Sequence, residues 1–139
     1  MKVLLIEDNP AHAELVKRSF EEHEVRNELY HQPDGAAALD FLFRRGVYSD
    51  PERSPRPDVI LLDLKLPKIN GLDVLKEIKS SPDLKRIPVV VLTTSNAQYD
   101  LETAYDRYAN SYLVKPADFP NFSELMEILG YYWLEYNSH

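Results

Sequence analysis

The sequence predicts an α/β domain built on a doubly wound, five-stranded parallel sheet with helices on both faces. Three short apolar runs, at residues 3–6, 59–62 and 89–92, are continuous rather than alternating in polarity. Strands that are buried on both faces have this composition, and they occur mainly in parallel sheets covered by helices. Helical patterns separate these runs, and such alternation is typical of the doubly wound class. The 139 residues fit a single domain, residues 1–139.

Each element follows from a local pattern. The helix after the first strand begins at Pro10, a residue suited to the first turn, with Asn9 as its expected cap. The remaining elements are expected, in chain order, as a strand at 25–31, a helix at 36–43 with Ala38, Leu39, Leu42 and Phe43 on one side, a strand at 59–62, a helix at 72–79 that stops near Pro82, a strand at 89–92, a helix at 98–108, a strand at 111–114 and a helix at 120–136. Gly46 and three prolines predict an extended, exposed loop at residues 44–58.

Composition excludes several classes of function. The chain has no cysteine, which excludes a disulfide scaffold, a thiolate zinc site and a cysteine nucleophile. A formal net charge of −7 disfavours a broad attraction to nucleic acid or anionic lipid. No apolar run approaches the roughly 20 residues needed to cross a bilayer, and Glu7 stands where a signal peptide would still be apolar. We therefore expect a cytoplasmic protein with no nucleic-acid or membrane partner.

Polar residues follow the apolar runs at the end where an open α/β sheet binds ligands. The residues that the predicted strands deliver there are Glu7, Asp8, Asp63, Thr93, Thr94 and Lys115. Singly, each has a plain alternative, such as a helix cap, a solvated acid, a strand residue or a surface lysine. Together they place a charged or hydroxyl group at the end of four strands. If the first and third strands are neighbours, the three carboxylates meet in one crevice.

Three clustered carboxylates disfavour joint ionisation unless a cation compensates them. Mg²⁺, a hard cation that prefers oxygen ligands, meets that need. The set therefore describes a site for a phosphoryl group carried on a carboxylate. Asp63 would attack, Mg²⁺ and Lys115 would neutralise the phosphoryl oxygens, and Thr93 would hydrogen-bond to one of them.

Five segments of the chain resemble the receiver domains of two-component response regulators. They are Val3-Leu4-Leu5-Ile6-Glu7-Asp8-Asn9, Leu61-Leu62-Asp63-Leu64-Lys65-Leu66-Pro67, Gly71, Pro88-Val89-Val90-Val91-Leu92-Thr93 and Tyr112-Leu113-Val114-Lys115-Pro116. The resemblance spans almost the whole chain and preserves order and spacing. It implies the CheY-like, flavodoxin-like (βα)5 fold with strand order 2-1-3-4-5.

The resemblance also implies a role for each matching residue. Asp63 corresponds to the phosphoacceptor, which takes its phosphoryl group from a histidine of a sensor kinase. Glu7, Asp8 and the backbone carbonyl of Lys65 correspond to the remaining Mg²⁺ ligands. The other matching residues are Thr93 as the switch hydroxyl, Lys115 as the phosphoryl-contacting lysine, Tyr112 as the aromatic that follows Thr93, and Pro116 with a cis peptide bond.

Two regions differ from a minimal receiver. The loop at 44–58 and the aromatic-rich ending resemble receivers partnered with phytochrome kinases in cyanobacteria and other bacteria. The helix at 120–136 has an apolar surface wider than one stripe, which indicates either a partner or homodimer interface or a helix that wraps the core. We expect no effector domain after the last helix, and therefore expect the output to be contact with a downstream protein or a phosphotransfer protein.

Two functions from different classes follow. The first is a stand-alone response regulator that assists its own phosphotransfer and dephosphorylation and is not a dedicated enzyme. The second is a receiver-like scaffold that binds a partner without being phosphorylated. A phosphatase with an aspartyl nucleophile would need a second Asp where the chain has Lys65, and a nucleotide-binding domain would need a glycine fingerprint that the chain lacks.

Overall fold

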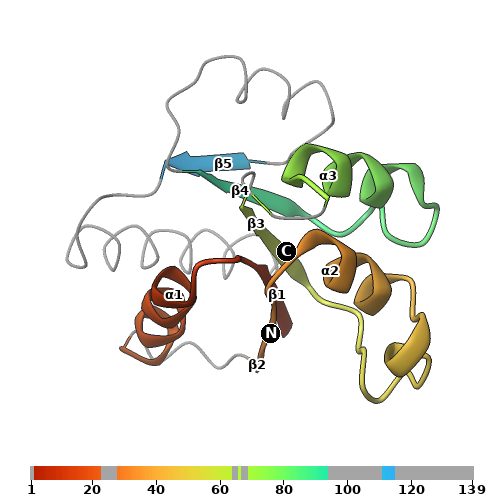
Figure 1. Ribbon diagram of the computed structural model, residues 1–139, viewed down its shortest axis with the longest axis horizontal. Coiled ribbons are helices and arrows are strands. Elements are labelled where there is room, and N and C mark those ends of the chain that lie inside the picture. Colours follow the sequence, from red (N-terminus) through yellow and green to blue (C-terminus); the bar gives the residue numbers. More distant parts are fainter. Residues whose placement is uncertain (1, 23–27, 64–65, 67–68, 94–110, 115–139) are drawn as a thin grey trace, which may run out of the picture.

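The computed structural model describes residues 2–22, 28–63, 66, 69–93 and 111–114 (Figure 1). Its five strands form one sheet of order β2-β1-β3-β4-β5, and every neighbouring pair is parallel. The strands are β1 (Lys2–Ile6), β2 (Glu28–Gln32), β3 (Val59–Asp63), β4 (Val89–Thr93) and β5 (Ser111–Val114). The predicted fold class and the strand order implied by the resemblance are both confirmed.

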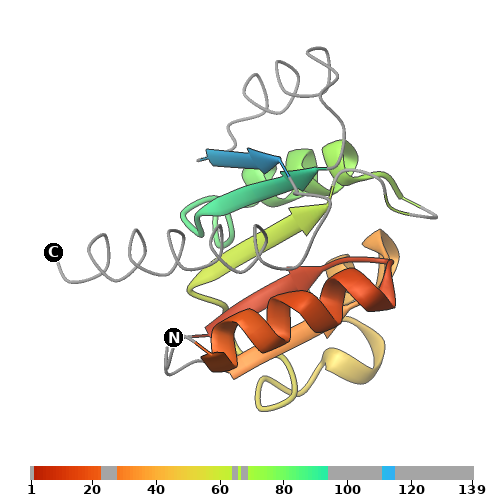
Figure 2. The same ribbon diagram turned by 90° about the vertical axis from the view of Figure 1, so that its left-hand side faces the viewer.

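Helices lie on both faces of this sheet, as a doubly wound domain requires. Figures 1 and 2 show α1 (Pro10–Glu22) on one face and α2 (Gly35–Leu42) with α3 (Gly71–Ser80) on the other. A short 3-10 helix, η1 (Gly46–Tyr48), follows α2. Among the described elements, no helix is both long and apolar enough to span a bilayer. The helices predicted at 98–108 and 120–136 lie outside the described residues.

Each of the three described α-helices begins behind an Asn or Asp whose side chain accepts hydrogen bonds from the first turn. The bonds run from the backbone N–H groups of Ala11 and His12 to Asn9 Oδ1 (2.9 and 3.3 Å), of Ala37 to Asp34 (2.8 Å) and of Asp73 to Asn70 (3.0 Å). Such a cap contributes about 1 kcal/mol to helix stability. The cap predicted at Asn9 is therefore confirmed.

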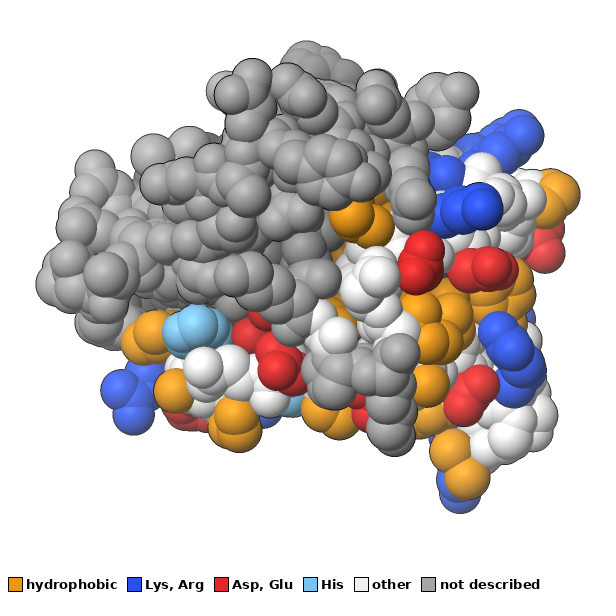
Figure 3. All heavy atoms as spheres, turned by 45° about the horizontal axis from the view of Figure 1, so that its top comes forward, with side chains coloured by type: hydrophobic (Ala, Val, Ile, Leu, Met, Phe, Trp, Pro, Cys, Tyr) orange, Lys and Arg blue, Asp and Glu red, His pale blue; other side chains and the backbone are white. Residues whose placement is uncertain are grey.

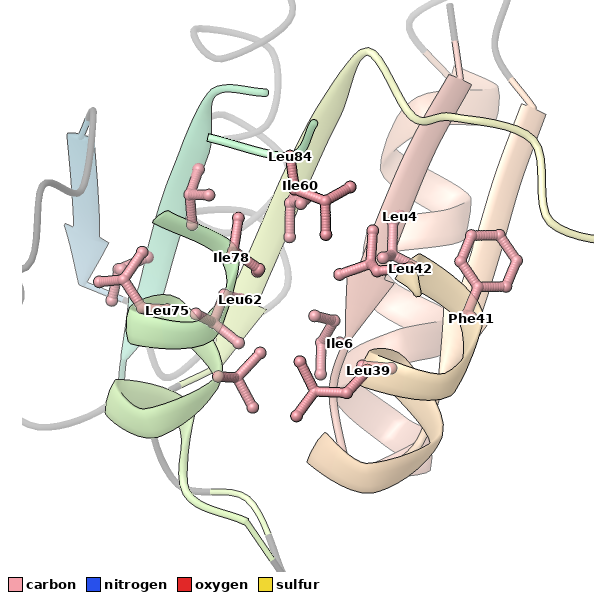
Figure 4. Close-up of a cluster of buried hydrophobic side chains, with 14 residues drawn as sticks. Leu4, Ile6, Leu39, Phe41, Leu42, Ile60, Leu62, Leu75, Ile78 and Leu84 are labelled. Atoms are coloured by element: carbon pink, nitrogen blue, oxygen red, sulfur yellow. The ribbon is translucent and has the colours of Figure 1, made fainter. Parts of the chain in front are cut away.

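The core lies between the central strands and the helices on either face. Figure 4 shows a cluster on the face of the sheet that α2 and α3 cover; its members include Leu4, Ile6, Leu39, Phe41, Leu42, Ile60, Leu62, Leu75, Ile78 and Leu84. The side of α2 that the sequence predicts to be apolar is confirmed: Ala38, Leu39 and Leu42 are buried, and Phe43 packs against the same cluster while partly buried. The pattern missed Phe41, which is also buried, and it placed the end of the helix one residue late, since α2 ends at Leu42 and Phe43 is its C-cap.

Residues 44–58, which we call the 44–58 lobe, are not simply the exposed loop that the sequence predicts. Tyr48 packs its ring edge-on against Phe41, with ring centroids 5.3 Å apart. Ser54 is 1% exposed, and its hydroxyl donates to the Tyr48 carbonyl oxygen at 2.8 Å. Arg56 donates to the carbonyl oxygen of Leu42 at the end of α2. The lobe therefore covers the side of α2 on which Phe41 lies, and Phe41 is buried there. Val47 of the lobe remains exposed.

Candidate functional site

The structure brings three acidic residues together at the carboxyl ends of β1 and β3. The two strands are neighbours, with Ile6 paired to Leu62, so the residues that follow lie side by side. Carboxylate oxygens of Glu7, Asp8 and Asp63 lie within 4.8 Å of one another. Glu7 is fully buried, Asp63 is 6% exposed and Asp8 is exposed. The crevice expected from the sequence is therefore present.

Glu7 is held in place by its backbone and by its side chain. Its N–H donates to the carbonyl oxygen of Gln32 at 3.1 Å, and its carbonyl oxygen lies 2.7 Å from His31 Nε2. Because a carbonyl oxygen can only accept, His31 Nε2 must carry a proton. The N–H of Asn9 donates to Glu7 Oε1 at 3.2 Å, and His12 Nδ1 lies 3.6 Å from the same oxygen. This carboxylate is thus oriented before any ligand binds.

The acidic cluster fits a hard divalent cation. Like charges a few ångström apart raise the free energy of the ionised state, and this cost is greater where burial removes water. A cation compensates the charge, and clustered carboxylate oxygens are ligands that Mg²⁺ and Mn²⁺ accept. Asp8 is exposed, so the cluster is open to solvent on that side. Figure 3 shows acidic side chains beside a histidine on one face of the molecule. The arrangement therefore suits a divalent cation that is reached from solvent.

The register of the sheet orders the other predicted site residues. Asp63 pairs with Leu92, so Thr93 ends β4 one residue beyond the partner of Asp63. Thr93 in turn pairs with Val114, the last residue of β5. The side chains of Thr93 and Tyr112 lie outside the described part of the structure, and so do the whole residues Lys65, Thr94, Lys115 and Pro116. The predicted cis peptide bond before Pro116 falls there too.

The family model for the response regulator receiver domain matches residues 3–127 of the chain. The chain belongs to the response regulator receiver family. Receivers are regulators of two-component signalling that accept a phosphoryl group from histidine kinases and bind a divalent metal. The predicted family and the phosphoryl-acceptor class of function are thus confirmed for this chain.

Relatives of this receiver match it over nearly its full length. Response regulator Rcp1 of Synechocystis sp. is 44% identical over 133 residues, which cover 96% of this chain and 88% of that protein. The probable methanogenesis regulatory protein FilR2 of Methanothrix harundinacea is 45% identical over 135 residues, which cover 97% and 84%.

Solved structures of response regulators are also similar to this chain. The crystal structure of the Mn²⁺-bound form of Rcp1 has a TM-score of 0.89 at 44% identity, covering 96% of this chain and 94% of that one. The phosphorylated cyanobacterial phytochrome response regulator RcpA has a TM-score of 0.90 at 41% identity, covering 96% and 93%.

Sequence reasoning missed the residues that hold this receiver site in shape. His31 and Gln32 end β2, the strand next to β1, and both bond to the backbone of Glu7. His12 stands in the first turn of α1, close enough to form an ion pair with Glu7 when protonated. A signal was available for His12, because the first turn of a helix after a strand faces the strand end. None was available for Gln32, whose role depends on the pairing of β2 with β1.

Proposed function

We propose that this receiver accepts a phosphoryl group on Asp63 from a histidine of a sensor kinase, with Mg²⁺ held by Glu7, Asp8, Asp63 and the backbone carbonyl of Lys65. The observation that carries the proposal is the convergence of three carboxylates, within 4.8 Å, at the ends of neighbouring strands. Burying two of these charges lowers the stability of the fold. A receiver-like scaffold that only bound a partner would have no need for that burial.

Asp63 is the best placed of the three carboxylates to be the acceptor. It ends β3, the central strand, so it lies between the acidic pair that follows β1 and the end of β4. Glu7 is fully buried, and its Oε1 is already engaged by Asn9 and His12. Asp8 is exposed, in the short connection between β1 and α1. A phosphoryl group on Asp63 therefore has the acidic pair on one side and β4 on the other.

Transfer needs one bond to form and one to break. A carboxylate oxygen of Asp63 attacks the phosphorus atom, and the P–N bond of the donor phosphohistidine breaks with its electron pair passing to the histidine nitrogen. Mg²⁺, when bound, supplies positive charge that offsets the phosphoryl oxygens. Lys115 contacts the same oxygens, and the hydroxyl of Thr93 donates to one of them. The receiver thus assists its own phosphotransfer. Water later attacks the phosphorus atom of the aspartyl phosphate, the P–O bond to Asp63 breaks, and inorganic phosphate leaves with the carboxylate restored.

The switch follows from the added charge of about −1.5 to −2 at neutral pH. We infer that Thr93 and Lys115 move toward the phosphoryl group, that Tyr112 changes its side-chain conformation with Thr93, and that a cis peptide bond at Pro116 positions Lys115. This local change would bias the surface formed by residues 98–136, which a partner reads.

The proposed partners follow from the family and from the phytochrome response regulator RcpA among the similar structures. We propose a sensor histidine kinase of the bacterial phytochrome class as donor and a downstream protein or phosphotransfer protein as recipient. We further propose a homodimer through residues 120–136, no direct contact with nucleic acid or membrane, and a cytoplasmic location.

Intact-mass spectrometry after treatment with acetyl phosphate and Mg²⁺ tests the acceptor. The wild-type protein is expected to gain the mass of one phosphoryl group, and Asp63→Asn none. Asp40→Asn is the matched control, because Asp40 is an exposed carboxylate paired only with Arg45 among the described residues; it is expected to be phosphorylated as the wild type is. A phosphoryl adduct on Asp63→Asn would exclude Asp63, and a folded wild type that gains no mass would favour the scaffold.

Phosphotransfer from purified kinases tests the donor. Radiolabelled phosphate is expected to move from an autophosphorylated bacterial phytochrome to this receiver within seconds to minutes, faster than from a kinase of another input class. EDTA is expected to stop the transfer. Equal rates from both kinases would contradict the phytochrome assignment and leave the assignment of Asp63 intact.

A further inference from the structure

Gly35, the first residue of α2, is a glycine because of space rather than backbone conformation. It is buried, and among the described glycines only Gly46 has a positive φ. A Cβ built on Gly35 would overlap the carbonyl oxygen of Ile69 and would lie 2.9 Å from Val74 Cγ2 and 3.0 Å from Ile69 Cβ. Even alanine is therefore too large at this position unless a neighbouring segment moves.

The atom that comes closest belongs to the segment that follows Asp63. Ile69 lies six residues after Asp63 and directly before Asn70, whose side chain caps α3. Its carbonyl oxygen is a backbone atom, so no change of rotamer can relieve the overlap. The segment between Asp63 and Ile69 also carries Lys65, the proposed carbonyl ligand. The approach of Gly35 to Ile69 thus fixes the far end of the connection that begins at Asp63.

The residues just before Gly35 connect it to Glu7. Gln32, three residues before Gly35, accepts a hydrogen bond from the Glu7 N–H at 3.1 Å. Asp34, directly before Gly35, caps α2 through the N–H of Ala37 at 2.8 Å. Both bonds hold the short connection from β2 to α2. Gly35 therefore lies where two segments meet. One is the connection that holds Glu7, and the other is the segment that follows Asp63.

We propose that Gly35 is a positioning residue for the metal centre. Its missing side chain lets Ile69 approach the start of α2 closely, and this approach keeps Asp63 near Glu7 and Asp8 so that the three carboxylates can share one divalent cation. The inference rests on the proposed function, because it concerns the cation that assists phosphoryl transfer to Asp63. It extends that function by assigning a residue that touches neither the metal nor the phosphoryl group.

A purely structural role for Gly35 makes a different prediction. Glycine is a poor helix former, so alanine at a helical position without overlap is expected to stabilise the protein. If Gly35 only served packing, Gly35→Ala would lower stability, and the folded protein would bind metal as before. If Gly35 positions the ligands, the folded protein binds metal more weakly.

Titration with Mn²⁺, followed by electron paramagnetic resonance well below the melting temperature, separates these roles. The Kd of Gly35→Ala is expected to rise about tenfold, a typical effect of disturbing the residues behind metal ligands. Competition with Mg²⁺ should show the same ratio. Gly46→Ala is the matched control, because Gly46 has a φ of +59° and open space around its Cβ position. It is expected to lose stability through backbone strain and to keep the wild-type Kd.

A second pair of variants keeps the test decisive if Gly35→Ala folds poorly. Val74→Ala removes the Cγ2 atom that lies 2.9 Å from the added Cβ, while the overlap with the Ile69 carbonyl oxygen stays. Gly35→Ala in the Val74→Ala background is therefore expected to bind Mn²⁺ about tenfold more weakly than Val74→Ala alone. Equal Kd values for these two variants would overturn the proposal.

The outcomes also distinguish this inference from the proposed function. An unchanged Kd in Gly35→Ala, with a phosphoryl adduct still formed on Asp63, would overturn the role of Gly35 and leave the function standing. A wild-type protein that bound neither Mn²⁺ nor Mg²⁺ would overturn both.

Discussion

At the ends of β1 and β3, apolar residues that stabilise the fold are followed directly by acidic residues that destabilise it. Residues 3–6 and 59–62 are apolar and at most 1% exposed, and burying them lowers the free energy of the folded state. The next residues, Glu7 and Asp63, are carboxylates that are almost as buried, at 0% and 6%. Confining them beside Asp8 raises that free energy. The strands therefore stabilise the fold, whereas the residues at their ends lower its stability and form a binding site.

The largest effect is expected where the apolar region is broken. Ile60→Ala removes a fully buried side chain from the cluster beneath α2 and α3. It is expected to lower the free energy of unfolding by about 2–5 kcal/mol, as large-to-small substitutions in cores do. Urea denaturation followed by circular dichroism measures the change. Val47→Ala, at a side chain that is 71% exposed, is the control and should change stability by less than about 0.5 kcal/mol.

A divalent cation is expected to stabilise the protein by binding to the acidic region. Mg²⁺ at one hundred times its Kd is expected to raise the free energy of unfolding by about 2.7 kcal/mol, because it binds only the folded chain. Asp8→Asn should be more stable than the wild type without metal, since one of three like charges is gone. It should also gain less from Mg²⁺. Melting curves with EDTA and with Mg²⁺ measure both; an Asp8→Asn variant less stable than the wild type in EDTA would refute the repulsion.

Lys79 is a half-buried lysine whose ammonium group has its hydrogen-bond partners in place. Its ammonium group donates to the carbonyl oxygens of Lys85 and Ile87 at 3.0 and 2.9 Å, which closes the turn between α3 and β4. Lys79→Met keeps the apolar stem and removes both bonds. The expected loss is about 1–2 kcal/mol, measured by urea denaturation. Lys76→Met, at an exposed position of the same helix, is the control.

Burial also lowers the pKa of Lys79, which makes its contribution depend on pH. Between this lowered pKa and the ordinary value of about 10.4, the unfolded chain binds the proton more tightly than the folded one. The contribution of Lys79 to stability therefore rises with pH in that interval. Tyr30, whose pKa is raised by its hydrogen bond to Glu28, contributes the opposite slope. The stability of Lys79→Met relative to the wild type should fall as pH rises through this interval; no change would contradict the sign.

The smallest effect is expected at the 44–58 lobe. Gln32 is 6% exposed and donates from Nε2 to the hydroxyl oxygen of Tyr48 at 3.1 Å. Tyr48→Phe leaves this buried amide without that acceptor and should lower the free energy of unfolding by about 1 kcal/mol. Tyr30→Phe removes a hydroxyl that bonds to Glu28 at an exposed position, so its stability should remain close to that of the wild type. Thermal melts of the two variants compare them directly.

The fold was predictable from the sequence to the extent that it depends on local pattern. The apolar runs predicted β1, β3 and β4 to within one residue, since strands buried on both faces are apolar throughout. The full buried set of α2 was less predictable: helical spacing indicated one side of the helix correctly and missed Phe41, which packs against Tyr48 of the 44–58 lobe. The lobe itself looked exposed because its prolines and glycine mark turns and do not reveal that Ser54 bonds back to Tyr48.

Local chemistry in the chain determines which residues form strands, where the described helices are capped and which carboxylates follow the strands, because these depend on neighbours a few positions apart. The order of the strands does not follow from periodicity, which left open whether β1 and β3 are adjacent. Only tertiary pairing brings Glu7 and Asp8 beside Asp63, sets Gln32 against Glu7 and presses Gly35 onto Ile69. The physical reason is that each of these contacts joins segments distant in the sequence, whose meeting depends on the packing of the whole sheet.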